Sequence, residues 1–128
     1  MSLSRNEYKA KVSVSIQEYL QSYDILELHR CLGLISLSGA TVRQQNVEVV
    51  KICLYLSLED SDRQREMICG LLSSFQVRAW LHWYEIELGL RTIFSRIEDI
   101  KLDYPTAESS LAQILVYLVQ DDAINEGR

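Results

Sequence analysis

The sequence predicts an all-α fold, in which about six helices stack as antiparallel pairs and no sheet forms. The 128 residues include one proline and five glycines. That is too few for a strand-and-turn protein, which needs a turn about every 8 to 12 residues. Apolar residues recur instead at helical spacing, and the connections are short, as in helix pairs that bury their stripes against one another. Because no repeat of fixed period is present, we expect the repetition to be structural only.

The first three helices are expected over residues 5–21, 25–35 and 42–58. Each follows a residue that can cap it and that has Glu or Gln three positions later. Residues 36–40 should form a loop, in which Gly39 supplies the backbone freedom. The β-branched residues of the third stretch would also suit a strand, but its capping pattern and helical neighbours favour a helix. The predicted capping pairs are Ser4 with Glu7, Asp24 with Glu27, and Thr41 with Gln44.

The last three helices are expected over residues 62–77, 82–96 and 105–120. Residues 97–104 are predicted to be an acidic junction between the last two helices. Pro105 is placed at the first position of the final helix, where its missing N–H costs nothing.

The predicted domain spans residues 5–121, with residues 1–4 and 122–128 as tails. Its core should be formed by the apolar stripe of each helix. The residues expected on these stripes include Val42, Leu71, Phe94, Leu115 and Val119.

Composition narrows the class of partner. The net charge is −5 and the isoelectric point is about 5.0, which disfavours direct nucleic-acid binding, because phosphate contacts need a surplus of Lys and Arg. An acidic chain is better suited to a basic protein surface. The stretches that carry the cysteines are apolar, so the odd set Cys31, Cys53 and Cys69 is expected to be free and buried. We therefore expect a monomeric domain of a larger protein, in the cytoplasm or the nucleus, without a signal peptide or membrane span.

The sequence offers little support for catalysis. His29 and His82 are far apart, and neither has a second ligand at metal-binding spacing. No glycine-rich phosphate loop and no nucleophile elbow are present. We expect no enzyme activity, no metal and no cofactor.

Two groups of residues are candidates for protein contacts. Asp99 and Asp103 could accept bidentate hydrogen bonds from a partner's arginines, although spacing alone favours a capping role for Asp103. Trp80 and Trp83, with Tyr84, lie at a predicted helix start. They fit either a binding hot spot or, as spacing favours, packing between the helices at 62–77 and 82–96.

Three blocks of sequence together resemble the MA3 domain, the helical module of initiation factor 4G and programmed cell death protein 4. The block from Gly89 to Pro105 is the most specific. It resembles the family signature, in which a glycine is followed further on by an acidic residue, Leu-x-Leu-Asp, one more residue and a proline. Glu98 stands where the family usually has proline. The other blocks are Ile16 to Leu20 with Asp24 to Glu27 and Cys31-Leu32, and Arg65 to Met67 with Leu71-Leu72.

The resemblance implies a HEAT-like stack of helix pairs without catalytic activity. Several family members dock on the DEAD-box RNA helicase initiation factor 4A through two acidic positions, which match Asp99 and Asp103. Glu98, Leu102 and Pro105 complete the candidate site. The alternative is an architectural scaffold that packs on neighbouring domains through Trp80 and Trp83.

Overall fold

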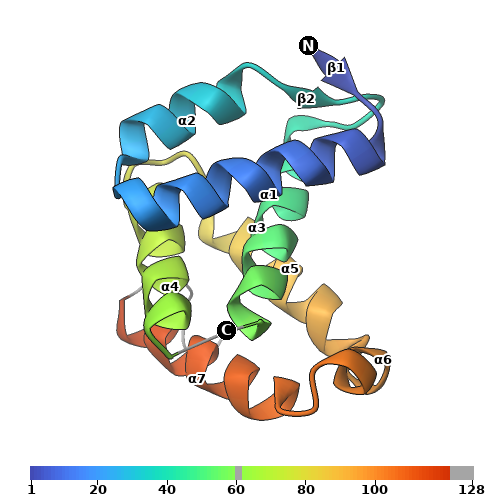
Figure 1. Cartoon of the computed structure of the whole chain (residues 1–128), viewed down its shortest axis with the longest axis vertical. Coiled ribbons are helices and arrows are strands. Elements are labelled where there is room, and N and C mark those ends of the chain that lie inside the picture. The colour runs from blue at the N-terminus through green and yellow to red at the C-terminus, as the bar shows by residue number, and fades with distance from the viewer. Residues whose placement is uncertain (60–61, 122–128) are drawn as a thin grey trace.

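The computed structural model describes residues 1–59 and 62–121. Within that part of the chain, seven helices pack against one another and two short strands pair, which confirms the all-α class (Figure 1). The elements are β1 (Ser2–Leu3), α1 (Arg5–Ser22), α2 (Ile25–Gly33), β2 (Ser36–Leu37), α3 (Val42–Leu58), α4 (Asp62–Val77), α5 (Trp83–Phe94), α6 (Ile97–Asp103) and α7 (Ala107–Gln120).

Three helices begin at the capping residues that the sequence predicted. The hydroxyls of Ser4 and Thr41 accept the N–H groups of residues three positions on, and both capping boxes are complete. Asp24 likewise accepts the N–H of Glu27 at 3.1 Å. These caps satisfy N–H groups that a helix start would otherwise leave unpaired, so they fix where each helix begins.

The long helix α3 lies at the centre of the core. It contacts α1, α4, α5 and α7, and its buried residues face several directions, as expected of a helix with neighbours on more than one side. In Figure 1, α1 crosses the upper part of the molecule and α7 the lower edge, with α3 and α4 running between them. The short helix α6 lies at the lower corner, where α5 leads into α7.

The expectation that no sheet forms was wrong at the N-terminal end. Ser2–Leu3 pairs in parallel with Ser36–Leu37, so the segment 1–4 is not simply a tail. Leu3 is buried, and burial of this side chain together with the paired backbone explains why a two-residue strand persists. Such a short pairing leaves no period-2 pattern in the sequence. The tail expected over residues 122–128 lies outside the described residues.

Some residues placed on apolar stripes are not buried. Phe94 and Leu115 are each 38% exposed and Val42 is 76% exposed, while Val119 is partly buried. Val42 is the first residue of α3 and Phe94 is the last residue of α5. At these helix ends, no neighbouring helix of the described chain extends far enough to cover the side chain. Leu115 lies on the outer side of α7, whose inner side packs on α4, α3 and α6. None of the described helices could cross a membrane.

Candidate protein-docking site

The predicted acidic junction is itself a short helix, α6. Ile100 turns inward and is 6% exposed, while Glu98 and Asp99 lie in the first turn, where negative charge is favourable. The acidic junction expected over residues 97–104 is therefore itself helical over most of its length. Seven residues with so few apolar positions are too short to show a helical period.

Asp99 and Asp103 lie four residues apart, so both side chains project from the same face of α6. Both residues are exposed, and Leu102 beside them is 81% exposed. Within the described residues, neither carboxylate has a hydrogen bond or ion pair. Asp99 is favourably placed in the first turn, but Asp103 lies at the C-terminal end of α6, where negative charge is unfavourable, and like charges at this spacing weaken a helix slightly. The two acids together therefore do little for the stability of α6. Their oxygens are open to donors from a partner.

The capping role that spacing favoured for Asp103 was wrong. Asp103 is the last residue of α6, and the residue before α7 is Thr106, with no side-chain cap. Pro105 is also not the first helical residue, because it lies with Thr106 in a turn in which the Ala107 N–H bonds the Tyr104 carbonyl at 2.9 Å. This turn leaves the Asp103 carboxylate uninvolved in the start of α7.

The single lysine of α6 is held by neighbouring acids. Lys101 Nζ lies 2.7 Å from Glu108 Oε1 on α7 and 3.7 Å from Glu98 Oε2. The Glu108 hydrogen bond raises the pKa of Lys101, so this cation stays charged and paired. Residues 98–108 hold four carboxylates and one lysine, a net charge of −3. The surroundings of the exposed acids are therefore negative.

Contacts from α6 and its exit fix the helix on the domain. The Lys101–Glu108 pair joins it to α7, and the Tyr104 hydroxyl donates to Glu59 Oε1 at 3.2 Å, next to the end of α3. Ile100 anchors it to the core. The acidic pair thus projects from a held helix and keeps a defined orientation.

Trp80 is partly buried and packs against α2 and α4, and not between the helices at 62–77 and 82–96 as its sequence position suggested. Its ring stacks on His29 of α2, with centroids 3.6 Å apart and planes 4° apart. It also meets the edge of Phe75 of α4 at 5.5 Å. Trp83 is partly buried and lies beside the rings of His82 and Tyr84. Trp80 therefore joins α2 to the turn between α4 and α5.

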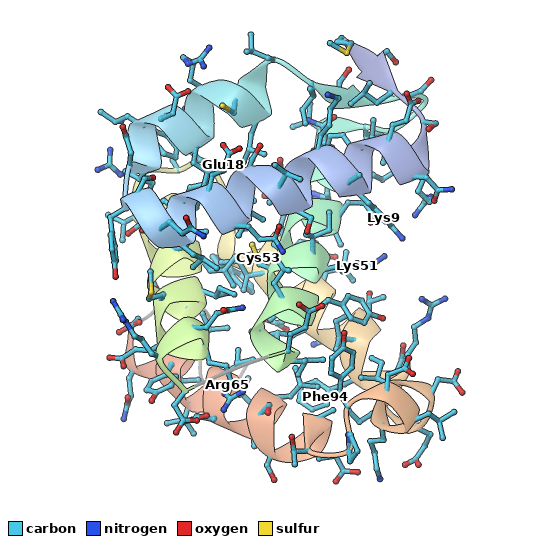
Figure 2. All side chains as sticks on the ribbon, in the orientation of Figure 1. Lys9, Glu18, Lys51, Cys53, Arg65 and Phe94 are labelled. Carbon is cyan, nitrogen blue, oxygen red and sulfur yellow. The ribbon has the colours of Figure 1, made fainter. Side chains whose placement is uncertain are left out.

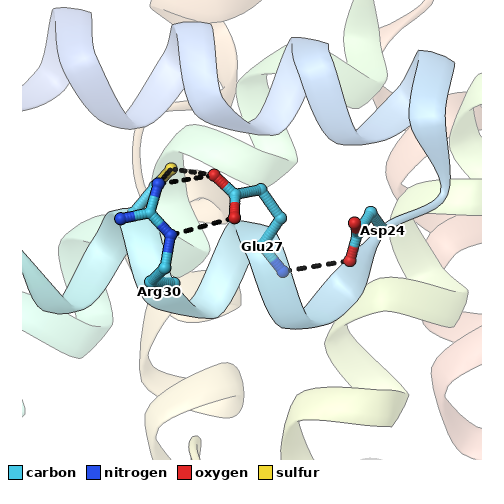
Figure 3. A network of polar contacts seen from close by, with 4 residues as sticks. Asp24, Glu27 and Arg30 are labelled. Atoms are coloured by element: carbon cyan, nitrogen blue, oxygen red, sulfur yellow. Dashed lines mark hydrogen bonds and ion pairs between the residues drawn. The ribbon is translucent and has the colours of Figure 1, made fainter.

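The sequence block of Asp24, Glu27 and Cys31, which resembles the MA3 family, forms a network of hydrogen bonds in α2 (Figure 3). Glu27 accepts two hydrogen bonds from Arg30, at 2.9 and 2.6 Å, and a third from Cys31 Sγ at 3.5 Å. The Arg30 and Cys31 hydrogen bonds lower the pKa of Glu27 to about 2. Since all these residues belong to α2 and its N-cap, the network stabilises this short helix from its first turn to its last.

The buried carboxylate of Glu48 was not predicted from the sequence. Its Oε1 accepts hydrogen bonds from Arg5 at 2.8 Å and Lys51 at 3.1 Å, which ties α1 to α3, and the side chain is 8% exposed. Burial by itself would raise the pKa of Glu48, but the hydrogen bond and charge of Lys51, with the charges of Arg5 and Lys9, hold it below its ordinary value. Figure 2 shows Lys9 and Lys51 on the same side of the molecule. A lone Glu inside an apolar run could have suggested this pairing.

The cysteines and histidines form no reactive site in the described chain. Cys53 and Cys69 are free and buried, and burial raises the pKa of each thiol to about 12, so both remain protonated. Cys31 is free and partly buried. No group of three or more His, Cys, Asp or Glu among the described residues could hold a metal ion.

Comparison with known proteins identifies the family of this helical domain. The MA3 domain matches residues 8–125. MA3 domain-containing translation regulatory factors 1 and 3 of Arabidopsis thaliana are 31% and 29% identical over 92% and 91% of this chain. A von Willebrand factor A domain-containing protein of Dictyostelium discoideum is 26% identical over 87% of the chain.

The chain spans 16% of each plant protein and 5% of the Dictyostelium protein. The matched region is thus a module within much longer relatives, and the MA3 domain is a non-catalytic interaction module found in translation regulatory factors. This chain belongs to the MA3 domain family.

Proposed function

We propose that this domain docks on the DEAD-box RNA helicase initiation factor 4A through the acidic face of α6, formed by Asp99, Leu102 and Asp103. The observation that carries the proposal is a pair of exposed carboxylates on one face of a helix fixed to the core, neither of which has a partner in the described part of the chain. The two acidic positions are those that the family resemblance assigns to helicase contact. Glu98 and Pro105 flank this face and complete the proposed site.

The chemistry of the acidic face suits a basic protein surface. A carboxylate can accept two parallel hydrogen bonds from one arginine, which gives orientation as well as energy. Leu102, 81% exposed, adds apolar area between the two acids that a partner can cover. Because α6 is held by α7 and by the residue next to α3, little ordering is needed on binding, and the cost of association is reduced.

The relatives supply the biological context for this proposal. The plant proteins are named as translation regulatory factors, and a domain that acts with initiation factor 4A would work in the cytoplasm, within a longer polypeptide. We propose that the domain acts as a monomer, without cofactor and without direct nucleic-acid contact.

The alternative, a scaffold that packs on neighbouring domains through Trp80 and Trp83, has less support. The Trp80 ring is already engaged by His29 and Phe75. Its side chain packs against the domain and does not project from the surface as the anchor of an interface would.

A pull-down with the isolated 128 residues and purified initiation factor 4A tests the proposal. We expect the helicase to be retained at low salt and to be released as salt is raised, because exposed charge pairs are screened over about 10 Å at 0.1 M ionic strength. No retention at low salt by a folded domain would reject it.

A further inference from the structure

An apolar cavity opens near the other end of α5 from the acidic face. It has a volume of 310 Å³ and lies between α2, the first half of α3 and the turn from α4 to α5. This is the low end of the roughly 300 to 1,000 Å³ typical of ligand pockets, so it suits one large side chain. We call it the Trp80 groove; its walls include His29, Leu32, Val42, Phe75, Trp80 and Leu81.

The backbone fixes the wall of this groove. Helix α4 ends in a Schellman motif, in which the Trp80 N–H bonds the Phe75 carbonyl at 2.8 Å and the Ala79 N–H bonds the Gln76 carbonyl at 3.0 Å. Ala79 has φ +62°, at a position where glycine is usual. The motif places Trp80 on Phe75, and the stack on His29 holds the ring from α2. The groove is thus preformed, which lowers the cost of binding.

Two arginines lie beside the groove, although neither is among the residues that line it. The Arg78 guanidinium lies 5.2 Å from the centroid of the Trp80 ring. Arg43, which follows the groove residue Val42, lies 5.1 Å from the centroid of the Tyr84 ring. Both arginines are exposed. Among the residues that the structure describes, no Asp or Glu lines the cavity.

The carboxylate of Glu85 near the rim of the groove is buried and held by hydrogen bonds inside the domain. Glu85 is buried, and its two oxygens accept from Asn46 at 3.2 and 3.1 Å, one of them also from the His82 N–H at 2.8 Å. Its oxygens are turned into the domain, so a segment bound at the groove would meet the exposed arginines before this carboxylate.

The groove and the acidic face are two separate surfaces of opposite charge. The groove adjoins the first turn of α5, and α6 follows its last turn. Twelve helical residues span about 18 Å at 1.5 Å per residue, which is longer than the screening length of about 8 Å at physiological salt. Each surface can therefore hold its own partner.

We propose that the Trp80 groove binds a protein segment in which one large apolar side chain is flanked by Asp or Glu. The apolar side chain fills the cavity, and the flanking carboxylates pair with Arg43 and Arg78. Charge complementarity selects this occupant, because the walls are uncharged and the exposed rim charges are arginines. A nucleic-acid strand would need a longer track of Lys and Arg to follow its phosphates.

Two short labelled peptides test this proposal with the full chain. In one, a tryptophan is flanked by glutamates, and in the other the glutamates are replaced by lysines. We expect the glutamate peptide to bind about tenfold more tightly, which is the effect of two partly screened charge pairs. The double variant Arg43→Glu, Arg78→Glu should reverse the preference, because it replaces both positive charges beside the groove with negative ones. Both side chains are exposed, so the variant should keep the helical circular dichroism spectrum of the parent.

A matched pair of exposed valines locates the binding. Val42→Asp adds a carboxylate at the groove and should abolish binding of the glutamate peptide, whereas Val116→Asp makes the same change on the outer side of α7 and should leave it intact. Val42 is 76% and Val116 54% exposed, so both variants should fold.

Several results would overturn the proposal. These are absence of glutamate-peptide binding, equal affinity for the two peptides, or unchanged binding by Val42→Asp. An oligouridylate that binds at the groove and displaces the peptide would assign the surface to nucleic acid and also overturn it. Val42→Asp should still bind initiation factor 4A, so failure at the groove is distinguishable from failure at α6.

Discussion

Gly89 of α5 lies directly against Val50 of α3, at the closest approach of the two helices. A Cβ built on Gly89 would lie 2.5 Å from Val50 Cγ1 and 3.0 Å from its Cβ. Val50 is fully buried and β-branched, so its side chain has little freedom to move away. The absence of a side chain at Gly89 therefore sets how α5 crosses α3, and with it the position of α6 that follows.

Gly89→Ala should destabilise the domain by about 1 to 3 kcal/mol, the usual cost of overpacking a core. This loss should exceed the gain of about 1 kcal/mol that alanine brings inside a helix. Chemical denaturation of the variant measures the difference. Gly70→Ala on α4 is the control, because a Cβ there meets nothing within 4 Å and Gly70 is exposed; it should be neutral or stabilising. Equal effects of the two changes would contradict this account of the α3–α5 contact.

Leu71 and Phe94 were both placed on buried stripes from their spacing, but the structure separates them. Leu71 is 1% exposed and Phe94 is 38% exposed at the end of α5. Leu71→Ala should cost about 2 to 5 kcal/mol of unfolding free energy, as at other buried sites. Phe94→Ala should cost about 1 kcal/mol or less, because much of its ring stays in water. Urea titrations of the two variants decide this, and an equal loss in both would place Phe94 in the core.

The comparison shows what spacing can and cannot predict. The caps at Ser4, Asp24 and Thr41 follow from local chemistry, so the starts of these three helices were predicted correctly. Burial at a helix end depends on where the neighbouring helix stops, which local spacing does not contain. This is why Phe94 and Val42 were misplaced.

The ion pairs of Glu48 should make stability depend on pH. The pKa of Glu48 is lowered in the folded state, so its contribution is present above the unfolded pKa, near 4.5, and is lost as the pH falls through the lower folded value. At pH 7, Glu48→Gln should cost about 1 to 3 kcal/mol, because it weakens hydrogen bonds to charged groups. The difference from the parent should shrink below about pH 4.5.

Thermal denaturation of the Glu48 variant across this pH range provides the check. Glu66→Gln, an exposed change on α4, is the control and should leave stability nearly unchanged at every pH. A loss that is constant from pH 7 to pH 3 would show that Glu48 acts through packing and not through its charge.

The candidate site could be located from sequence only in part. The resemblance marked Asp99 and Asp103, but their shared face depends on α6 being helical, and seven residues give no periodic signal. The role of Asp103 was misjudged because the turn at Pro105 separates it from the start of α7. The Trp80 groove joins α2, α3 and the α4–α5 turn, and no linear pattern connects these segments.

The most direct test of the account is the affinity of the domain for initiation factor 4A after its α6 carboxylates are neutralised. Asp99→Asn, Asp103→Asn should weaken binding by about 30-fold or more, since breaking desolvated charge pairs costs about 2 to 5 kcal/mol. The control variant Glu18→Gln, Glu66→Gln makes the same change in net charge on α1 and α4, away from α6. It should alter the affinity by less than about twofold, because exposed charges outside the contact contribute little. A folded Asp99→Asn, Asp103→Asn variant that binds the helicase as tightly as the parent would contradict the account.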